Sequence, residues 1–346
     1  MPPTRSADHL PVPGHVIRVG GAIALFPLLR GRGIDPEALA VEAGLSAEVF
    51  ANPDNVVPFT ALCRLAHLAR ERTGLSDVGL RACMTTGLSA LGLLGYLVAN
   101  SESVGRGLRA LQEFLHVHDE GATMFAATEG DSAVLGYEVL TRGVPGADQV
   151  TFGALAIAAN VLRELCGADF RFQEVNFAYH APADVSLFRS FFGAPLRFDA
   201  ERSGLVYKAH WLATPVAGAD SFIREMLVDR IRQQLADAPD STGDRLRRVI
   251  RSLVAGGRFT VDDLAAAFAL NRRTLARRLN DHGTTFRELL GEARFIAAKN
   301  LLQSSEVPVA EIAARLGYSD TPAFTRAFRR WAGASPAEWR QRHRTF

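Results

Sequence analysis

The segment Asp320-Thr-Pro-Ala-Phe-Thr-Arg-Ala-Phe-Arg-Arg-Trp331 decides the fold of the C-terminal part of the chain. Its apolar residues at positions i, i+3, i+4 and i+7 are Phe324, Ala327, Phe328 and Trp331. This spacing gathers apolar side chains on one face of an α-helix, so that face is expected to be buried. Threonine and arginine occupy the other faces. The segment therefore predicts a short helix whose exposed front is rich in hydrogen-bond donors and positive charge, which suits DNA.

A second helix is predicted directly before this segment, within Pro308-Val-Ala-Glu-Ile-Ala-Ala-Arg-Leu-Gly317. The same apolar spacing recurs there, its proline suits the first helical position, and its last glycine can end the helix in the left-handed conformation. Ser319 or Asp320 can cap the next helix with a side-chain oxygen. Two short helices joined by a tight glycine-containing turn, the second of them basic, predict a helix-turn-helix unit over residues 308–332.

An earlier copy of this unit is predicted over residues 260–283. Residues 260–268 repeat the apolar spacing, and Asn271 can cap the helix that follows. Leu275 and Leu279 are expected to point inward. The arginines of this second helix then lie on its outer faces.

One long amphipathic helix is predicted between the two units, over residues 285–303. At about 1.5 Å per residue, some twenty residues span roughly 30 Å. This length is close to the ~34 Å between successive major-groove faces on one side of DNA, so one rigid chain can place two recognition helices in adjacent grooves. Arg294 is expected to brace this helix, and Trp339, in a last helix after Ser335, is expected to close the core.

These motifs together resemble the DNA-binding domain of the AraC/XylS family of bacterial transcription regulators, over about residues 244–344. The anchors include Arg273-Thr-Leu-Ala-Arg-Arg-Leu279, Leu316-Gly-Tyr-Ser-Asp320, Phe324-Thr-Arg-Ala-Phe-Arg-Arg-Trp331 and Ser335-Pro336. A match over so many separate anchors is more specific than a single short motif. It implies an all-α C-terminal domain with two helix-turn-helix units that binds double-stranded promoter DNA.

The resemblance and the outward position of each residue imply which side chains contact DNA. Base edges should be faced by Arg273, Ala276, Arg277, Thr321, Pro322, Thr325 and Arg326. Arginine can donate two hydrogen bonds to guanine, whereas alanine, proline and threonine methyl groups can only touch thymine methyls or exclude water. Phosphates should be contacted by Arg272, Arg278, Arg329 and Arg330, and Asn271 completes the predicted DNA-binding set. The alternative for the arginines is a solvated helix face.

Charge is divided unevenly along the chain. Residues 241–346 contain 19 Lys and Arg against 10 Asp and Glu, a net +9, and the remainder carries −7. A basic C-terminal part can contact phosphates and release counterions, whereas an acidic N-terminal part is a poor nucleic-acid binder. Chance unevenness of surface charge is the alternative.

Residues 1–236 are predicted to form one α+β domain. Apolar periodicity and Gly or Pro breaks predict helices over residues 16–29, 35–44, 58–72, 91–99, 103–117, 147–166 and 182–192. Alternating patterns predict strands, the first two paired as a hairpin, over residues 123–128, 133–140, 172–179, 196–198 and 205–207. The polar segment 237–243 is expected to be a linker to the DNA-binding domain, residues 244–346.

The segments Leu91-Gly-Leu-Leu-Gly-Tyr96 and Phe191-Phe-Gly-Ala-Pro-Leu-Arg-Phe198 are similar to the N-terminal effector domain of one subgroup of AraC-type regulators. This resemblance implies a domain that binds a small metabolite and carries the dimer contact. Residues 91–97 and 152–162 could line an apolar pocket for a hydrophobic or amphipathic acid, but plain core is the preferred interpretation. The sequence identifies no effector-binding residue.

Other clusters of reactive side chains favour no further chemistry. His116-Val-His118-Asp-Glu120 could supply metal ligands if extended, but a helix-to-strand junction with solvated polar residues is the preferred interpretation. The cysteines at 63, 83 and 166 are expected to be buried free thiols. No catalytic arrangement is found, so no enzyme activity and no cofactor are expected. Without a signal peptide or a long apolar stretch, a cytoplasmic protein without membrane contact is predicted.

The patterns together predict a sequence-specific DNA-binding transcription regulator that responds to a small metabolite and acts as a homodimer with RNA polymerase as a partner. Because the family mostly activates transcription, we expect an activator. One alternative is a DNA-binding regulator without an effector. Another is an enzyme whose DNA-binding domain regulates it.

Overall fold

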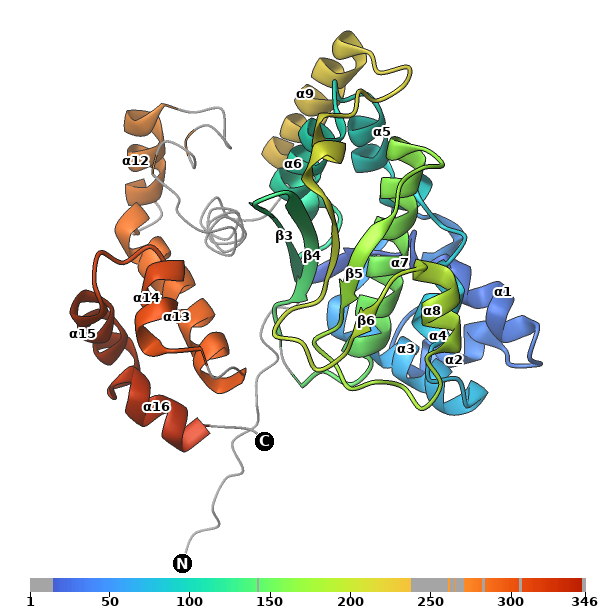
Figure 1. Ribbon diagram of the computed structural model, residues 1–346, viewed down its shortest axis with the longest axis horizontal. Helices are drawn as coiled ribbons and strands as arrows, with labels where there is room; N and C mark the ends of the chain where they lie inside the picture. Colours follow the sequence, from blue (N-terminus) through green and yellow to red (C-terminus); the bar gives the residue numbers. More distant parts are fainter. Residues whose placement is uncertain are drawn as a thin grey trace, which may run out of the picture.

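The computed structural model of the chain describes residues 15–141, 143–237, 261, 265, 271–281, 284–304 and 307–343. Buried apolar side chains form two separate clusters, one within residues 17–231 and the other within residues 265–328. Figure 1 shows the C-terminal helices as a body beside the larger N-terminal body. The predicted linker lies outside the described residues apart from its first residue, so the predicted domain limits stay a prediction.

The N-terminal body combines helices with a five-stranded sheet, as the α+β prediction requires. Its helices are α1 Leu25–Arg30, α2 Pro36–Glu42, α3 Phe59–Thr73, α4 Val78–Cys83, α5 Leu93–Ala99, α6 Val104–Phe114, α7 Ala147–Cys166, α8 Ser186–Phe192 and α9 Ser221–Asp237. Short 3-10 turns follow or precede several of them, at Ala22–Ala24, Ala47–Ala51, Leu88–Leu91, Leu115–Val117 and Ala209–Ala213. The predicted helix over residues 147–166 is confirmed at both ends.

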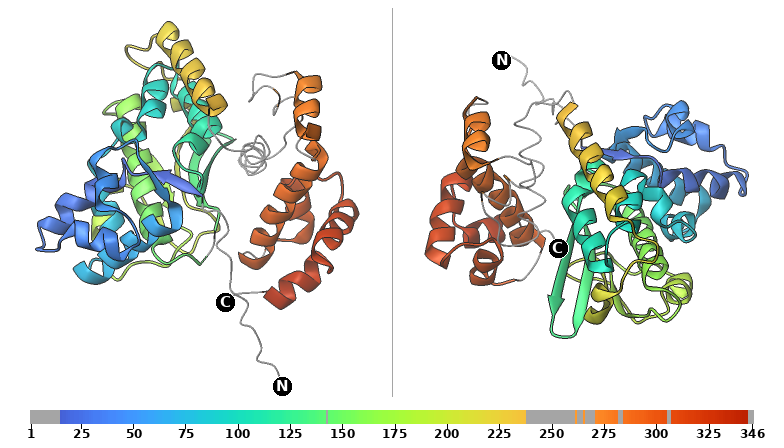
Figure 2. Two further views of the ribbon diagram at one scale, coloured as in Figure 1. Left: turned by 180° about the vertical axis from the view of Figure 1, so that it is seen from behind. Right: turned by 90° about the horizontal axis from the view of Figure 1, so that it is seen from above.

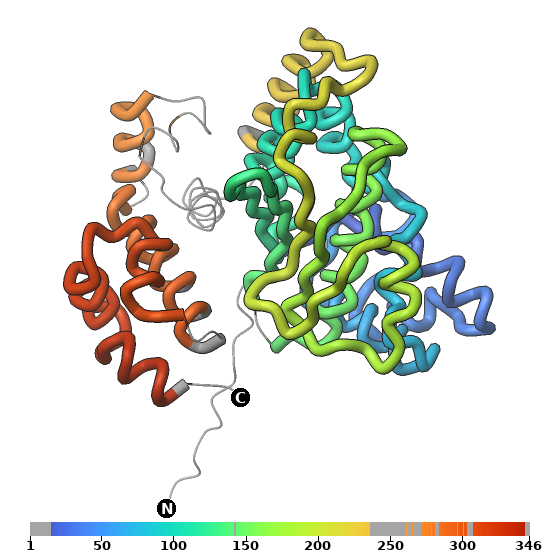
Figure 3. The backbone as a smooth tube through the Cα atoms, viewed as in Figure 1, coloured from blue at the N-terminus to red at the C-terminus, as the bar shows by residue number. Residues whose placement is uncertain are grey.

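The main sheet has the strand order β3-β4-β7-β5-β6. Its strands are β3 Ala122–Glu129, β4 Ser132–Val139, β5 Phe172–Asn176, β6 Leu196–Arg197 and β7 Gly204–Lys208. Neighbours are antiparallel except β5 and β6, and the predicted hairpin is confirmed as β3 and β4. Gly136 lies opposite Phe125, where an added Cβ would lie 1.9 Å from the phenyl ring. The tube view in Figure 3 follows these strands beside α7, the helix that packs on β4.

The prediction of a first helix over residues 16–29 is wrong for its first part. Residues Val16–Arg18 form strand β1, which pairs with β2, Val56–Pro58. On its other side, the Arg18 amide donates to the His118 carbonyl oxygen at 2.8 Å. These partners are distant in the sequence, so the local apolar pattern could not reveal them. The helix α1 begins only at Leu25, after Gly20-Gly21.

Among the described residues, the C-terminal body contains helices and no strand. The described ones are α12 Arg272–Asp281, α13 Phe286–Ser304, α14 Val309–Arg315, α15 Thr321–Ala332 and α16 Pro336–His343. The spacer helix is therefore confirmed within one residue as α13. Figure 2 shows α13 to α16 packed together from behind and from above, with α12 extending from this group. The first helix of the first unit, predicted over residues 260–268, lies outside the described residues except for 261 and 265.

The core of this body is centred on α15. Phe324 and Phe328 are 1% and 2% exposed, and Trp339 packs edge-on against Phe328. Trp331 was expected in this core and instead remains 46% exposed. It stacks on Phe295 of α13, with ring centroids 5.8 Å apart, at the edge of the cluster. The helix α16 begins with a capping box, in which the side chains of Ser335 and Glu338 accept hydrogen bonds from each other's backbone amides.

Candidate nucleic-acid interface and ligand cavity

The helix α15 is fixed at both ends by short-range chemistry. The Asp320 side chain accepts a hydrogen bond of 2.6 Å from the Ala323 amide, which caps the first turn. Gly333, at φ +70°, ends the helix in the left-handed conformation. With Phe324 and Phe328 buried on one face, the arginines lie on the opposite side.

The predicted contact residues of α15 all lie at or beside that exposed face. Arg326, Arg329, Arg330 and Pro322 are exposed, and Thr321 and Thr325 are half-buried. The helix therefore offers guanidinium groups and threonine hydroxyls on one surface. Such a surface fits a groove lined by phosphates and base edges.

The helix α12 repeats this arrangement. The Asn271 side-chain oxygen accepts a hydrogen bond of 2.8 Å from the Thr274 amide, which confirms it as the cap. Leu275 and Leu279 are buried as predicted. The predicted contact residues Arg272, Arg273, Ala276 and Arg277 are exposed, and the side chain of Arg278 lies outside the described part.

Arg294 connects the spacer helix to the second unit. Its guanidinium donates to the Gly317 carbonyl oxygen at 3.2 Å and lies 4.9 Å from the centre of the Tyr318 ring. Burial lowers the pKa of Arg294. Because Gly317 and Tyr318 form the turn between α14 and α15, this contact fixes the turn against α13, in line with the bracing role predicted for Arg294.

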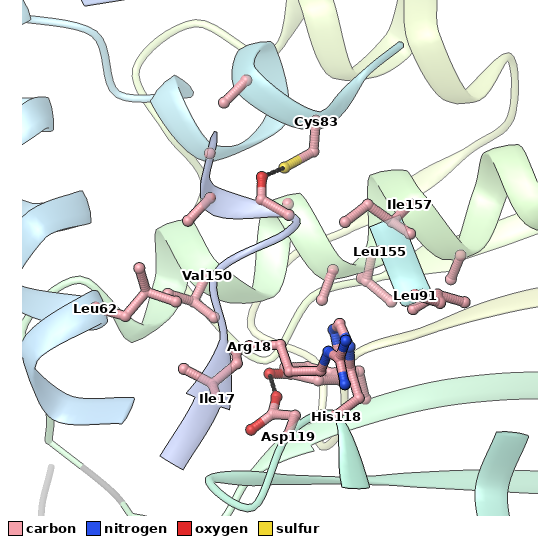
Figure 4. Close-up of a pocket in the computed structure, with 18 of the residues that line it drawn as sticks. Ile17, Arg18, Leu62, Cys83, Leu91, His118, Asp119, Val150, Leu155 and Ile157 are labelled. Atoms are coloured by element: carbon pink, nitrogen blue, oxygen red, sulfur yellow. Dashed lines mark hydrogen bonds between the residues drawn. The ribbon is translucent and has the colours of Figure 1, made fainter. Parts of the chain in front are cut away.

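A cavity lies inside the N-terminal body, between α7, β4, residues 17–25 and the turn Leu88–Leu91. Its volume is about 140 Å³. Most of its wall is apolar, and its larger side chains include Leu25, Leu62, Leu91, Leu111, Ile157 and Val161. Figure 4 shows several of these residues around the cavity. Of the two segments predicted as pocket or core, Leu91, Leu155 and Ile157 line the cavity. Leu94, Leu97 and Phe152 do not line it and are core, so the preferred interpretation as plain core holds only for part of these segments.

Polar groups gather at one end of this cavity. Arg18 and His118 line it, and the Arg18 guanidinium forms an ion pair with Asp54. The side chain of Arg18 is 13% exposed and that of Asp54 is 63% exposed, so the ion pair runs from the cavity to the surface. Burial, together with the positive charge of Arg18, lowers the pKa of His118 to about 4. The imidazole is therefore neutral at neutral pH.

Asp119 is buried at 2% exposure beside this polar end. It accepts hydrogen bonds from the Tyr137 hydroxyl at 2.5 Å and from the Gly121 amide at 2.8 Å. Burial raises the pKa of Asp119 to about 6, although both hydrogen bonds lower it. The expectation that residues 116–120 are solvated is therefore wrong for Asp119. Within the described residues, no group of three or more His, Cys, Asp or Glu side chains could hold a metal ion.

Comparison with known families decides the class of the protein. Residues 33–216, more than half of the chain, match the family described as the arabinose-binding domain of AraC transcription regulators, and residues 264–342 match a helix-turn-helix domain. The chain belongs to the AraC family of transcription regulators. This membership confirms the resemblance seen in both parts of the sequence. The matching families and relatives are regulators, so the enzyme alternative is not supported.

Several AraC-type regulators are similar to this chain along almost its whole length. The ornithine utilization regulator of Pseudomonas aeruginosa is 26% identical and matches over 94% of this chain and 96% of its own. The regulator VirS of Mycobacterium tuberculosis is 25% identical over 94% of this chain and 97% of its own. The crystal structure of CdpR from Pseudomonas aeruginosa covers 93% of this chain and 98% of its own, with 21% identity and a TM-score of 0.49.

Sequence reasoning about this AraC-family chain missed the polar end of the cavity. The sequence pattern predicts a helix at Arg18 and favours a solvated His118, with a metal ligand as the alternative. Antiparallel pairing of β1 with residues 118–120 sets Arg18 directly opposite His118. No signal in the local pattern could have shown this pairing. Among the described helices, none has the length and apolar character needed to span a membrane.

Proposed function

We propose that this AraC-family protein activates transcription from specific promoters when a small metabolite binds its N-terminal body. The observation that carries the proposal is the pair of capped helices, α12 and α15, each with a buried apolar face and exposed arginines. If the arginines only formed a solvated surface, the chain would not need two capped helices with the same buried and exposed faces on either side of one spacer helix.

In this proposal, the two helices enter successive major grooves. Arg273, Arg277 and Arg326 donate to base edges, and the threonines of α15 contact thymine methyls. Arg329 and Arg330, on the same exposed side, contact phosphates. The limits 1–236 and 244–346 for the effector and DNA-binding domains, and the linker over 237–243, are part of the same proposal.

The cavity of the N-terminal body supports the effector role. A metabolite bound there changes DNA binding only if it binds two states of the protein with different affinity. A DNA-binding regulator without an effector would have no use for a cavity with an arginine at one end. The cavity therefore favours a regulator that responds to an effector over a regulator without one.

We further propose that the active form is a cytoplasmic homodimer that recruits RNA polymerase. Several large apolar side chains on α5 and α9 are exposed, namely Tyr96, Phe222, Ile223 and Met226. Exposed apolar patches of this kind mark protein contacts. Light scattering of the purified protein tests the dimer, and Met226→Glu should shift the mass toward the monomer, whereas Glu225→Gln on the same helix should not.

Run-off transcription tests the activator role directly. The template carries a promoter fragment that the protein binds, and the reaction contains purified RNA polymerase with or without the protein. We expect more transcript with the wild-type protein when its effector is also present, and no increase with Arg273→Ala/Arg326→Ala. A decrease in transcript with the wild-type protein would identify a repressor.

A further inference from the structure

We infer that the cavity binds a small, mostly apolar monocarboxylate, whose carboxylate lies between Arg18 and His118. This inference rests on the proposed effector role of the N-terminal body and specifies the chemistry of that effector. Arg18 precedes the segment matched to the family domain, residues 33–216, whereas His118 lies within it.

The position of Arg18 and His118 follows from the backbone. Ile17 and Asp119 form an antiparallel bridge, and the Arg18 amide bonds to the His118 carbonyl oxygen. Residues directly opposite on antiparallel strands project their side chains to the same face. Figure 4 accordingly shows the Arg18 and His118 side chains next to each other, with Asp119 directed the other way.

Both side chains have hydrogen-bonding capacity left for a ligand. Nδ1 of His118 is buried and has no hydrogen-bond partner among the described residues. An unpaired buried nitrogen is costly unless a ligand or water satisfies it. The Arg18 guanidinium has five N–H donors. Among the described residues it hydrogen-bonds only to Asp54, so its other donors are available to a ligand. Two donors side by side suit the two oxygens of a carboxylate.

Asp54 does not prevent a second carboxylate from binding to Arg18. Its side chain is 63% exposed, and exposed ion pairs contribute little to stability. It can therefore turn toward solvent when a ligand carboxylate approaches the guanidinium. Gly92 lies close to the ion pair of Arg18 and Asp54, since a Cβ added to Gly92 would lie 3.3 Å from Nη2 of Arg18. This end of the cavity therefore has little free space.

The rest of the cavity selects an apolar body of limited size. Leu91, Leu111 and Ile157 offer no hydrogen bonds. Tyr137 and Gln149 also line the cavity, but their side chains already hydrogen-bond within the protein. Each buried ligand hydroxyl without a partner costs affinity. A sugar with hydroxyls on every carbon is therefore a poor fit, despite the name of the family domain. The volume of about 140 Å³ is of the size that takes up benzene in another protein, which limits the ligand to about six to ten non-hydrogen atoms.

Calorimetric titration of the full-length protein with matched pairs of compounds tests the inference. The probes are hexanoate against hexanamide and phenylacetate against phenylacetamide, with L-arabinose as a polyol. We expect each acid to bind at least about tenfold more tightly than its amide, because a charge-assisted contact is lost in the amide. Arabinose should not bind measurably.

Substitutions at the polar end of the cavity test whether Arg18 and His118 contact the ligand carboxylate directly or only support the structure of the cavity. Arg18→Met should weaken binding of the acids by about tenfold to a hundredfold and leave the amides unchanged. Arg18→Lys should restore part of the affinity, and His118→Gln should weaken the acids less than Arg18→Met does. The control Arg72→Met removes a surface pair with Glu42, at 2.7 Å, and should change nothing. Thermal unfolding of each variant without ligand establishes that it is folded.

Three results would overturn the inference. If acid and amide bind with equal affinity, no cationic contact selects the ligand. If Arg18→Met weakens the binding of acid and amide equally, Arg18 has only a structural role in the cavity. Binding of none of the acids would remove the ligand class altogether. Site-specific DNA binding, measured on the same protein without ligand, judges the proposed regulator function separately, so a failure of this inference leaves that function standing.

Discussion

The Tyr137 hydroxyl donates a hydrogen bond of 2.5 Å to Oδ2 of Asp119 at the cavity wall. Burial raises the pKa of Asp119 from 3.8 to about 6, and burial lowers the pKa of the adjacent His118 from 6.5 to about 4. Native Asp119 holds its proton more tightly than the unfolded chain does, so its contribution to stability falls as pH rises from about 4 to about 6. Native His118 holds its proton less tightly, so its contribution rises from about pH 4 to about 6.5.

Single substitutions should separate these opposing contributions. Asp119→Asn keeps an acceptor for Tyr137 but no longer titrates, so the free energy of unfolding should rise more steeply between about pH 4.5 and 6 than in the wild type. His118→Gln should change the slope in the opposite direction. One proton corresponds to at most about 1.4 kcal/mol per pH unit. Urea unfolding at several pH values measures the slopes, and parallel curves for all three proteins would contradict this account of the two groups.

The arginines of α12 and α15 should differ in what they recognise. Arg273→Ala and Arg326→Ala should each cost about 1–3 kcal/mol at the cognate site and relax the preference at one base position. Arg330→Ala should weaken binding to all sequences alike and lower the salt slope by about 1. Binding to cognate and scrambled duplexes at several salt concentrations measures both effects. If Arg326→Ala keeps its full preference, that arginine only positions the protein.

The cap of the first recognition helix should contribute to stability. Asn271→Ala removes the acceptor for the Thr274 amide and should destabilise the C-terminal body by about 1 kcal/mol. Asn271→Ser retains a capping oxygen and serves as the control. Thermal unfolding measures the change. Equal unfolding temperatures for the Ala and Ser variants would mean that Asn271 acts on DNA alone and not as a cap.

Filling the cavity should separate effector response from DNA binding. Ala154 of α7 lines the cavity, and Ala154→Met adds a side chain that occupies the space of a ligand. DNA affinity should then no longer change when the effector is added, and affinity without effector should persist. Ala168→Met, at an exposed position after α7, is the matched control. Binding to a cognate duplex with and without ligand measures the response; a retained response in Ala154→Met would place the effector elsewhere.

Elements defined by local chemistry could be predicted from the sequence. The helix α15 could be predicted because its apolar spacing and its Asp320 cap lie within twelve consecutive residues, 320–331. The hairpin β3–β4 was predicted for the same reason, since its turn and both strands are contiguous.

Features that depend on distant partners could not be predicted. Strand β1 is three residues long and exists because residues 56–58 and 118–120 lie on either side of it. The polar end of the cavity depends on this pairing and so escaped sequence reasoning. Trp331 fits the apolar stripe of α15, but it stacks on Phe295 at the edge of the cluster and stays exposed, which depends on packing between helices.

Genome-wide binding of the purified protein to fragmented host DNA, at a stated salt concentration, tests the central claim most directly. The control is the double variant Arg273→Ala/Arg326→Ala, which keeps the fold and most of the positive charge. We predict discrete sites for the wild-type protein that are lost in the double variant. Salt-sensitive binding to all fragments, without discrete sites, would contradict sequence-specific recognition by these two helices.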